Sequence, residues 1–382
     1  MNLLEKIGTS IAKKQISKPK IFLSILFLIL LLVAPGIPLL LGHVEPSLEK
    51  VLPQQVQELK VMNLMRGQFG ADMMYLLVSV KGPVYDVRDS SAMNYMDLLE
   101  SKLRLNNFLI DVNGLPELVK QVNNGVIPDS NEEIKNLLLL NPNTMMFLND
   151  DYSTAIIQIK SDTGSSASVI KEVVQEIEST INSLESQNPG LEISITGFNA
   201  IDKATFEVMM KDFALITGFS FLFMLLFLLF YFRGSIRKVF MTISVIIISL
   251  IITLGLTGYL GITITVVTMV AAAMIMALGV SYGINVTYEY YLLRKNNDKK
   301  ESLKILVKNL IRALVGSSFT TSAGFLALLF GVIPAMKNLG IVLAGGIVVT
   351  LLVSILFLPV IIYLLDKQDD KKMIINIKQL NN

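Results

Sequence analysis

The stretch AAAMIMALGVSYGIN, residues 271–285, is an apolar run with a few polar side chains near its end. Its alanines and glycines are small enough to let helix backbones approach one another closely, as helices do inside a membrane bundle. In a helix, Ser281, Tyr282 and Asn285 stand at positions i, i+1 and i+4, so their polar groups lie on about one face. The stretch therefore predicts a helix that packs inside a membrane and carries a polar face.

Six apolar segments, including this one, are long enough to cross a membrane, because a hydrocarbon core about 30 Å thick needs about 20 apolar residues in a helix. Of the 382 residues, 52% are hydrophobic, a high share for a soluble protein. One span precedes a long polar stretch and five follow it. The predicted spans are Ile21–Leu41, Phe213–Phe232, Val239–Leu260, Ile262–Tyr288, Ala313–Met336 and Leu339–Leu365.

This layout predicts five regions along the chain. We expect the first span to be an uncleaved anchor, because its apolar run is longer than a typical signal-peptide core and no A-x-A site follows it. The predicted regions are a cytoplasmic basic N-terminus (1–20), transmembrane helix 1 (21–42), an extracytoplasmic domain (43–211), transmembrane helices 2–6 (212–365) and a cytoplasmic tail (366–382).

The distribution of Lys and Arg predicts how the chain is oriented, since cytoplasmic loops carry an excess of both. Residues 1–20, 233–238, 294–312 and 366–382 are basic, and all four regions fall on one side of the membrane if there are six spans. Residues 43–211 are acidic on balance. We therefore expect a multi-pass plasma-membrane protein with both termini cytoplasmic and the large domain outside. Contact with anionic membrane lipids explains the basic loops better than nucleic acid does.

The extracytoplasmic region alternates between strand and helix patterns. Apolar residues alternate with polar ones in the predicted strands and recur at helical spacing in the predicted helices. The order is strand–helix–strand twice, which is the α+β ferredoxin-like (βαββαβ) pattern of a porter-type domain. The strands are expected at Met74–Val80, Phe108–Val112, Ala155–Ile159 and Leu191–Ile195, and the helices over 93–103 and 170–184.

Three other segments of this region are apolar on one side. The run Leu137–Leu140 is expected to pack against the core, although contact with a lipid substrate is an alternative. Residues 44–70 and 200–212 are amphipathic and are expected to be helices that join the domain to the membrane.

No residue pattern of an enzyme or a metal centre is present. G-x-S-x-G, P-loop and dinucleotide-binding motifs are absent. There is no Cys, and the single His43 cannot form a His cluster. Asp150-Asp151 and Glu132-Glu133 are typical of solvated turns, and Gly164-Ser165-Ser166 of a helix N-cap. We therefore expect no enzyme activity, no cofactor and no metal.

Two motifs resemble those of one transporter family. Gly279–Ile284 resembles the fourth-helix motif G-[IV]-D-Y-x-[IV] of the RND superfamily, in its MMPL and Patched-like branch. Thr320–Leu328 resembles the helix-five signature TT-x-x-GF-x-x-L, and Gly340 and Pro359 fit the sixth helix. The resemblance covers nearly the whole chain and is specific over residues 197–360. It implies an RND-type membrane helical bundle with transport core positions at Ser281, Tyr282, Asn285, Thr320 and Thr321.

The chain corresponds to half of a typical member of that family. Members commonly hold two parallel repeats of six spans, with the transport path between the repeats. This chain holds a single six-helix repeat, so the resemblance implies a homodimer or a heterodimer with a sister RND half.

Ser281 stands where the family has Asp. In proton-driven members that carboxylate is thought to take up protons, whereas Ser does not titrate at physiological pH. Glu289, eight residues on and about 12 Å away along the helix, is a candidate titratable site, although an interfacial acid in a basic neighbourhood is the preferred interpretation. Hydrogen bonding between helices is the alternative role for the polar motif residues.

The leading hypothesis is thus a subunit of an RND/MMPL-type transporter that exports or relocates lipid or another hydrophobic substrate, with proton coupling in doubt. The first alternative, motivated by Ser281, is a non-transporting accessory subunit for lipid sensing or assembly. The second is a protein-export auxiliary similar to SecD and SecF, whose fourth-helix motif differs from the one found here.

Overall fold

The structure is a computed structural model that describes residues 3–45, 51–53, 55–61, 64, 72–81, 85–161 and 167–366. The chain divides into two compact units, each described here by itself. The membrane unit comprises the chain up to Glu45 and from Met209 on, and the sheet unit comprises residues 54–208. The predicted N-cap at Gly164–Ser166, most of the amphipathic segment 44–70 and the tail after Asp366 lie outside the described residues.

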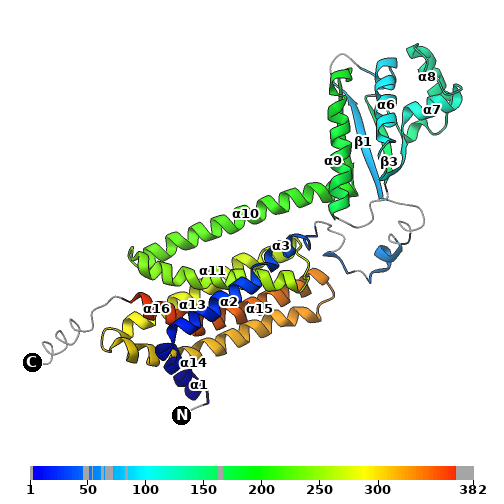
Figure 1. Ribbon diagram of the computed structural model, residues 1–382. Helices are drawn as coiled ribbons and strands as arrows, with labels where there is room; N and C mark the ends of the chain where they lie inside the picture. Colours follow the sequence, from blue (N-terminus) through cyan, green and yellow to red (C-terminus); the bar gives the residue numbers. More distant parts are fainter. Residues whose placement is uncertain are drawn as a thin grey trace, which may run out of the picture. The chain divides into compact units, whose positions relative to one another are not determined.

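Within the described residues, six helical segments of the chain are long and apolar enough to cross a membrane, which agrees with the predicted number (Figure 1). Several are interrupted, and a further helix, α1 (Leu3–Ser17), precedes them. The segments are α2 (Pro19–Val33) with α3 (Gly36–Leu41), α10 (Phe198–Tyr231), α11 (Ile236–Tyr259), α12 (Val266–Met269) with α13 (Ala271–Leu293), α14 (Lys299–Leu326) with the 3-10 turn η3 (Ala327–Phe330), and α15 (Pro334–Leu356) with α16 (Leu358–Leu365).

Glycines bring α3 and α11 into contact. A Cβ atom added to Gly36 would overlap the carbonyl of Gly255, and one added to Gly258 would overlap the carbonyl of Gly36. Helices in a membrane associate through such close packing, because lipid provides no hydrophobic force to bring them together. These three glycines therefore fix the position of the first span in the bundle.

Helix α14 begins at Lys299, well before the predicted start of the fifth span at Ala313. The Asp298 side chain accepts a hydrogen bond from the backbone N–H of Glu301 at 2.8 Å and caps the helix. Buried residues then recur at helical spacing through the basic part, at Leu303, Leu306, Val307, Leu310 and Ile311. The segment is helical because this apolar stripe packs on α1 and the bundle, while its Lys and Arg side chains point outward.

Helix α1 also closes the break in the sixth span. Pro359 has no backbone N–H, so the carbonyl of Ile355, four residues earlier, has no helical donor. The buried Gln15 side chain donates from Nε2 to the carbonyl oxygens of Ile355 at 2.8 Å and Leu356 at 3.0 Å. A residue near the N-terminus thereby satisfies the backbone where α15 ends and α16 begins.

The sheet unit is a four-stranded antiparallel sheet covered on one face by helices. Its strands stand in the order β2-β3-β1-β4. The chain order is β1, α6, β2, then β3, α9, β4, as predicted, with two short helices inserted between β2 and β3. The bounds are β1 (Asp72–Val80), α6 (Ser90–Leu103), β2 (Leu109–Asn113), α7 (Leu115–Val122), α8 (Asn131–Leu140), η1 (Thr144–Met146), β3 (Thr154–Ser161), α9 (Ala167–Ser183), η2 (Glu185–Gln187) and β4 (Leu191–Gly197).

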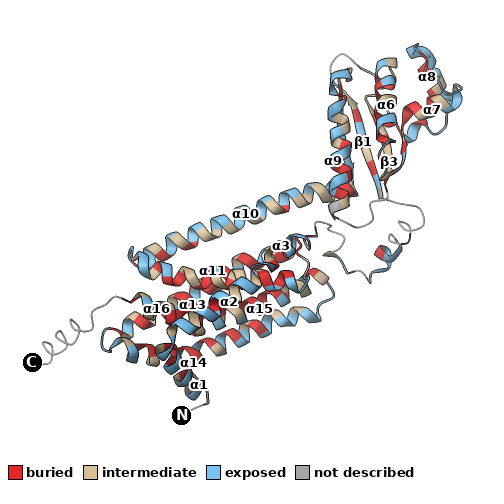
Figure 2. Ribbon diagram, viewed as in Figure 1, coloured by how far each residue is buried: buried red, intermediate tan, exposed pale blue. Residues whose placement is uncertain are grey.

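The core of this unit follows from strand alternation. On β1, Met74, Leu76 and Val78 are fully buried, whereas Met73 and Leu77 are each 39% exposed. Figure 2 shows how buried and exposed residues are distributed over the elements of this unit. The buried side chains of β1 and β3 form one cluster with those of α6 and α9. Successive strand residues point to opposite faces, so this pattern means that the two helices cover a single face of the sheet.

Candidate functional site

The polar motif residues of the fourth span divide between the interior and the surface of the membrane unit. Tyr282 is buried, and its hydroxyl lies 2.7 Å from Oγ of the buried Ser318 on α14. Ser281 and Asn285 are exposed, and their side chains make no hydrogen bond within the described part of the chain. The motif therefore ties α13 to α14 through Tyr282 and presents Ser281 and Asn285 outward.

The threonine pair of the fifth span, like Ser281 and Asn285, makes no side-chain hydrogen bond to any other helix that the structure describes. Thr320 is exposed and Thr321 is half-buried. Both hydroxyls donate to the carbonyl of Ser317, one turn earlier, at 2.9 Å. Since their hydrogen bonds stay within α14, the structure does not join them to the motif residues of α13. Ser318, which was not among the predicted transport core positions, makes that connection instead.

Glu289 is half-buried and has an amide partner. Its Oε1 accepts a hydrogen bond from Nδ2 of Asn309 on α14 at 2.9 Å. The contact joins α13 and α14 a second time, away from the Tyr282 hydroxyl. Among the described residues, no group of three or more His, Cys, Asp or Glu side chains could hold a metal ion.

A buried charge pair lies where the fourth and sixth spans end. Arg294 Nε donates to Oδ2 of Asp366 at 2.8 Å, and the Tyr290 hydroxyl donates to the same oxygen at 2.8 Å. The Lys299 ammonium donates to the Asp366 carbonyl at 3.0 Å. Sequence reasoning placed Asp366 at the start of the tail and missed this network. The only available signal was that an Arg and an Asp each follow a span on the same predicted side.

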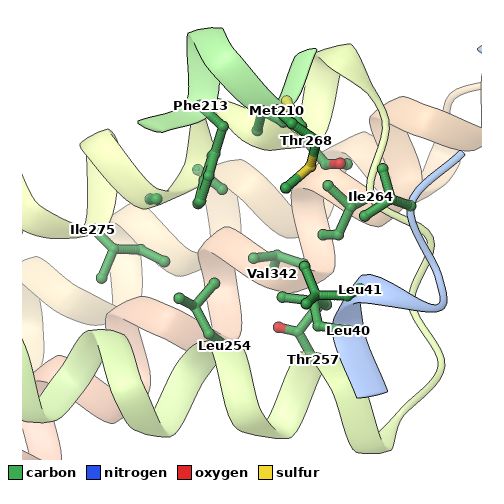
Figure 3. A pocket seen from close by; sticks show the side chains of 14 residues that line it. Leu40, Leu41, Met210, Phe213, Leu254, Thr257, Ile264, Thr268, Ile275 and Val342 are labelled. Atoms are coloured by element: carbon green, nitrogen blue, oxygen red, sulfur yellow. The ribbon is translucent and has the colours of Figure 1, made fainter. Parts of the chain in front are cut away.

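An apolar pocket lies in the membrane unit beside the α12–α13 break (Figure 3). Its volume is about 50 Å³, so it is a narrow slot. Leu40, Met210, Phe213 and Ile275 are among the side chains that line it, and they come from α3, α10 and α13.

The few polar side chains of this pocket are already bonded. The Thr257 hydroxyl donates to the Thr253 carbonyl at 2.7 Å. The Thr268 hydroxyl accepts from the backbone N–H of Thr265 at 2.7 Å and donates to its carbonyl at 3.1 Å. A ligand there would find apolar surface and no free hydrogen-bonding partner, so the pocket suits a hydrocarbon chain.

Comparisons with known proteins identify relatives of this chain. The chain is 28% identical over 355 residues to a membrane protein of Methanocaldococcus jannaschii, and the match covers 91% of this chain and 91% of that protein. It is 27% identical over 180 residues to MmpL4 of Mycobacterium leprae, named a probable transport protein, covering 46% of this chain and 19% of that one.

The fold is also similar to that of the hedgehog release protein Disp from the water bear Hypsibius dujardini, with a TM-score of 0.64 and 12% sequence identity. The match covers 94% of this chain and 50% of Disp, so the chain spans half the length of that structure. The likeness shows a membrane α-helical RND-type fold. Residues 52–375 match the family model described as MMPL family. Because that match covers most of a multi-pass membrane chain, the protein belongs to the MMPL family of the RND superfamily.

Proposed function

We propose that this protein is a subunit of a transporter that exports or relocates lipid or another hydrophobic molecule. The observation that carries the proposal is the apolar pocket of the membrane unit, whose only lining hydroxyls are already hydrogen-bonded. Such a lining excludes water and polar solutes but accepts a hydrocarbon chain. Membership of the MMPL family, with a named transport protein among the similar chains, supports transport as the activity.

The sheet unit is proposed to be an extracytoplasmic ferredoxin-like domain of porter type. Its βαββαβ chain order and its antiparallel strand order β2-β3-β1-β4 support this assignment. The basic segments beside the spans support an orientation in the plasma membrane in which both termini are cytoplasmic and the sheet unit is outside.

Pairing with a second RND half is proposed to complete the transporter. Ser281, Asn285 and Thr320 are polar and exposed on helices that cross the membrane. A polar side chain facing hydrocarbon is costly, and a partner helix bundle with its own polar groups would cover it. The partner is a second copy of this chain or a sister half.

Proton coupling through the fourth-span motif is not part of the proposal, because Ser281 does not titrate at physiological pH. The presence of Ser281, where the family has Asp, favours the second candidate function, a non-transporting accessory subunit that senses lipid. The two differ in one measurable property, namely whether the purified protein moves lipid across a bilayer.

The test is lipid transfer by the full chain in reconstituted vesicles. Ala272 lines the pocket and is buried, so Ala272→Leu would fill it. We expect the variant to slow transfer about tenfold, equivalent to about 1.4 kcal/mol. Ala327→Leu, at an exposed alanine outside the pocket, is the matched control. Undiminished transfer by Ala272→Leu, with the pocket filled and the melting temperature preserved, would remove the basis of the proposal. No transfer by the unchanged protein, alone or with its partner, would favour the accessory role.

A further inference from the structure

The sheet unit contains its own pocket, between α8, η1 and the turn that precedes β3. Its volume is about 160 Å³. An engineered cavity of about 150 Å³ in another protein holds benzene, so this one has room for a small head group. Arg88, Lys135, Asn141 and Tyr152 form its polar part, and Leu139 and Met145 stand on its apolar side.

The large apolar side chains on and next to the apolar side of this pocket are mostly exposed to solvent. Leu139 is 69% exposed and Met145 is 64% exposed, and their sequence neighbours Leu140 and Met146 are 75% and 63% exposed. The Thr144 hydroxyl donates to the Leu138 carbonyl at 2.6 Å, which holds η1 against the end of α8. Leu138 alone of the predicted apolar run is deeply buried. Two of these exposed side chains, Leu139 and Met145, line the pocket, and large apolar side chains exposed together are typical of a binding surface.

The charges of the polar part cancel. Arg88 donates from Nε and Nη2 to both carboxylate oxygens of Asp86, at 2.8–3.2 Å. Lys135 lies 3.1 Å from Asp86 and 3.6 Å from Asp89. Burial tends to raise the pKa of Asp86, but the hydrogen bonds from Arg88 outweigh it and hold the pKa below its usual value. The two cations that line the pocket are thus paired with Asp86 and Asp89, which lie outside its lining, so the pocket attracts neither anions nor cations strongly.

Hydrogen-bond donors remain in the pocket although the charges cancel. Asn141 uses its Oδ1 to accept from the backbone N–H of Asn143 at 3.0 Å. Its Nδ2 makes no hydrogen bond to any residue that the structure describes, and this nitrogen carries two N–H groups. The pocket therefore offers donors without net charge, which suits a neutral acceptor such as an ester or amide oxygen.

Tyr152 holds the guanidinium of Arg88 in place at the cost of backbone strain. Its ring lies 3.4 Å from the Arg88 carbon Cζ. Its φ angle is +62°, which is rare for a bulky residue, and such conformations cost on the order of 1–3 kcal/mol. The Val87 backbone N–H donates to the Tyr152 carbonyl at 3.1 Å and helps to fix it. A strained residue that orients a pocket side chain is a feature found repeatedly at binding sites.

We propose that this pocket binds the polar end of an uncharged amphiphile whose head group carries hydrogen-bond acceptors, with the hydrocarbon chain lying on Leu139 and Met145. An ester or amide oxygen accepts from Nδ2 of Asn141. This inference deepens the proposed function, on which it rests for the hydrophobic nature of the ligand. Binding in the sheet unit is measured without transport, so it fails or succeeds separately from the lipid-transfer test.

The experiment is photo-crosslinking of the full chain in lipid nanodiscs. The probes are a monoacylglycerol and a fatty acid with the same chain and the same diazirine, one neutral and one anionic. Peptide mass spectrometry then locates the label. We expect the neutral probe to label peptides within residues 135–152, about tenfold more than the fatty acid, which corresponds to about 1.4 kcal/mol.

Met145→Glu is the test variant, because the residue is exposed and its replacement leaves the core intact. Leu105→Glu is the matched control, at a side chain 77% exposed in the same unit but outside the pocket. Labelling lost in Met145→Glu and kept in Leu105→Glu supports the proposal. Equal labelling by both probes, labelling unaffected by Met145→Glu, or a change of oligomeric mass in that variant without any labelling of 135–152 would each overturn it. The last result would make the surface a protein interface.

Discussion

Glu100 is a carboxyl side chain buried in the sheet unit, with 1% of its surface exposed. Its Oε1 has no hydrogen-bond partner among the described residues, and Nη2 of Arg104 lies 3.8 Å from its Oε2. Burial raises the pKa of Glu100 to about 8, against a usual value of 4.5, and Arg104 offsets only part of that effect. The side chain is therefore mostly protonated in the folded protein at neutral pH.

This side chain predicts a pH-dependent stability. The folded form binds a proton that the unfolded chain releases above its usual pKa, so stability is complete below about pH 4.5 and falls as pH rises towards 8. Glu100→Gln resembles the protonated form, and we expect it to stabilise the sheet unit by roughly 2–4 kcal/mol at pH 8. Denaturant unfolding across this range measures the difference.

Glu192→Gln, at an exposed glutamate of the same unit, is the control and should leave the pH profile unchanged. A wild-type stability that stays constant between pH 5 and pH 8 would contradict the assignment.

The Tyr282–Ser318 contact gives a second prediction at the scale of residues. Interhelical hydrogen bonds in membranes contribute about 0.6 kcal/mol on average. A double-mutant cycle with Tyr282→Phe and Ser318→Ala should yield a coupling energy of about that size. Thr320→Val in place of Ser318→Ala should show no coupling to Tyr282, because Thr320 bonds only within its own helix. Coupling in both cycles would mean that the variants disturb the bundle as a whole.

Helix α1 has a structural task that its position at the N-terminus does not suggest. Gln15→Leu would leave the Ile355 and Leu356 carbonyls without their donor at the Pro359 break. An unsatisfied buried carbonyl costs about 1–3 kcal/mol, and loss of the already unpaired Gln15 Oε1 offsets part of this. We therefore expect the membrane unit to lose about 1–2 kcal/mol in unfolding free energy.

Lys14→Leu, at an exposed position of the same helix, should have little effect. If both variants unfold like the wild type, the Gln15 hydrogen bonds contribute nothing to stability.

The close contact of Gly255 in α11 with Val33 at the end of α2 predicts a large loss of stability when one methyl group is added. Gly255→Ala would force its Cβ against the carbonyl of Val33, and overpacking of this kind typically costs about 1–3 kcal/mol. Gly345→Ala in α15 has open space around its Cβ and is the matched control. Thermal unfolding in detergent compares the two. Equal melting temperatures would show that α11 and the end of α2 can separate without loss.

At the scale of the whole molecule, the absence of Cys makes the orientation directly testable. Single cysteines introduced as Lys13→Cys in α1 and Leu105→Cys in the sheet unit stand at exposed positions of the two units. We expect a membrane-impermeant maleimide to label Leu105→Cys in intact cells and Lys13→Cys only after the cells are opened. The reverse pattern would place the sheet unit in the cytoplasm and contradict the proposed export.

The sequence by itself determined the number of spans, the order of strands and helices in the sheet unit, and the family. Apolar runs, alternation on β1 and β3, and the residues of the fourth-span motif are local patterns, and each follows from the geometry of one helix or strand. The same local patterns misplaced the start of α14. The charged residues before Ala313 argued against a membrane span, and the pattern did not show that α1 covers the apolar face of this segment.

Only the tertiary structure decided which polar and apolar residues are buried. It paired Arg294 with Asp366, brought Gln15 to the Pro359 break, and buried Tyr282 while leaving Ser281 and Asn285 exposed. It also separated Leu138 from Leu139, one inside the sheet unit and the other at a pocket mouth. These outcomes depend on contacts between segments far apart in the chain. The spacing of residues within one segment carries no information about what a distant segment covers.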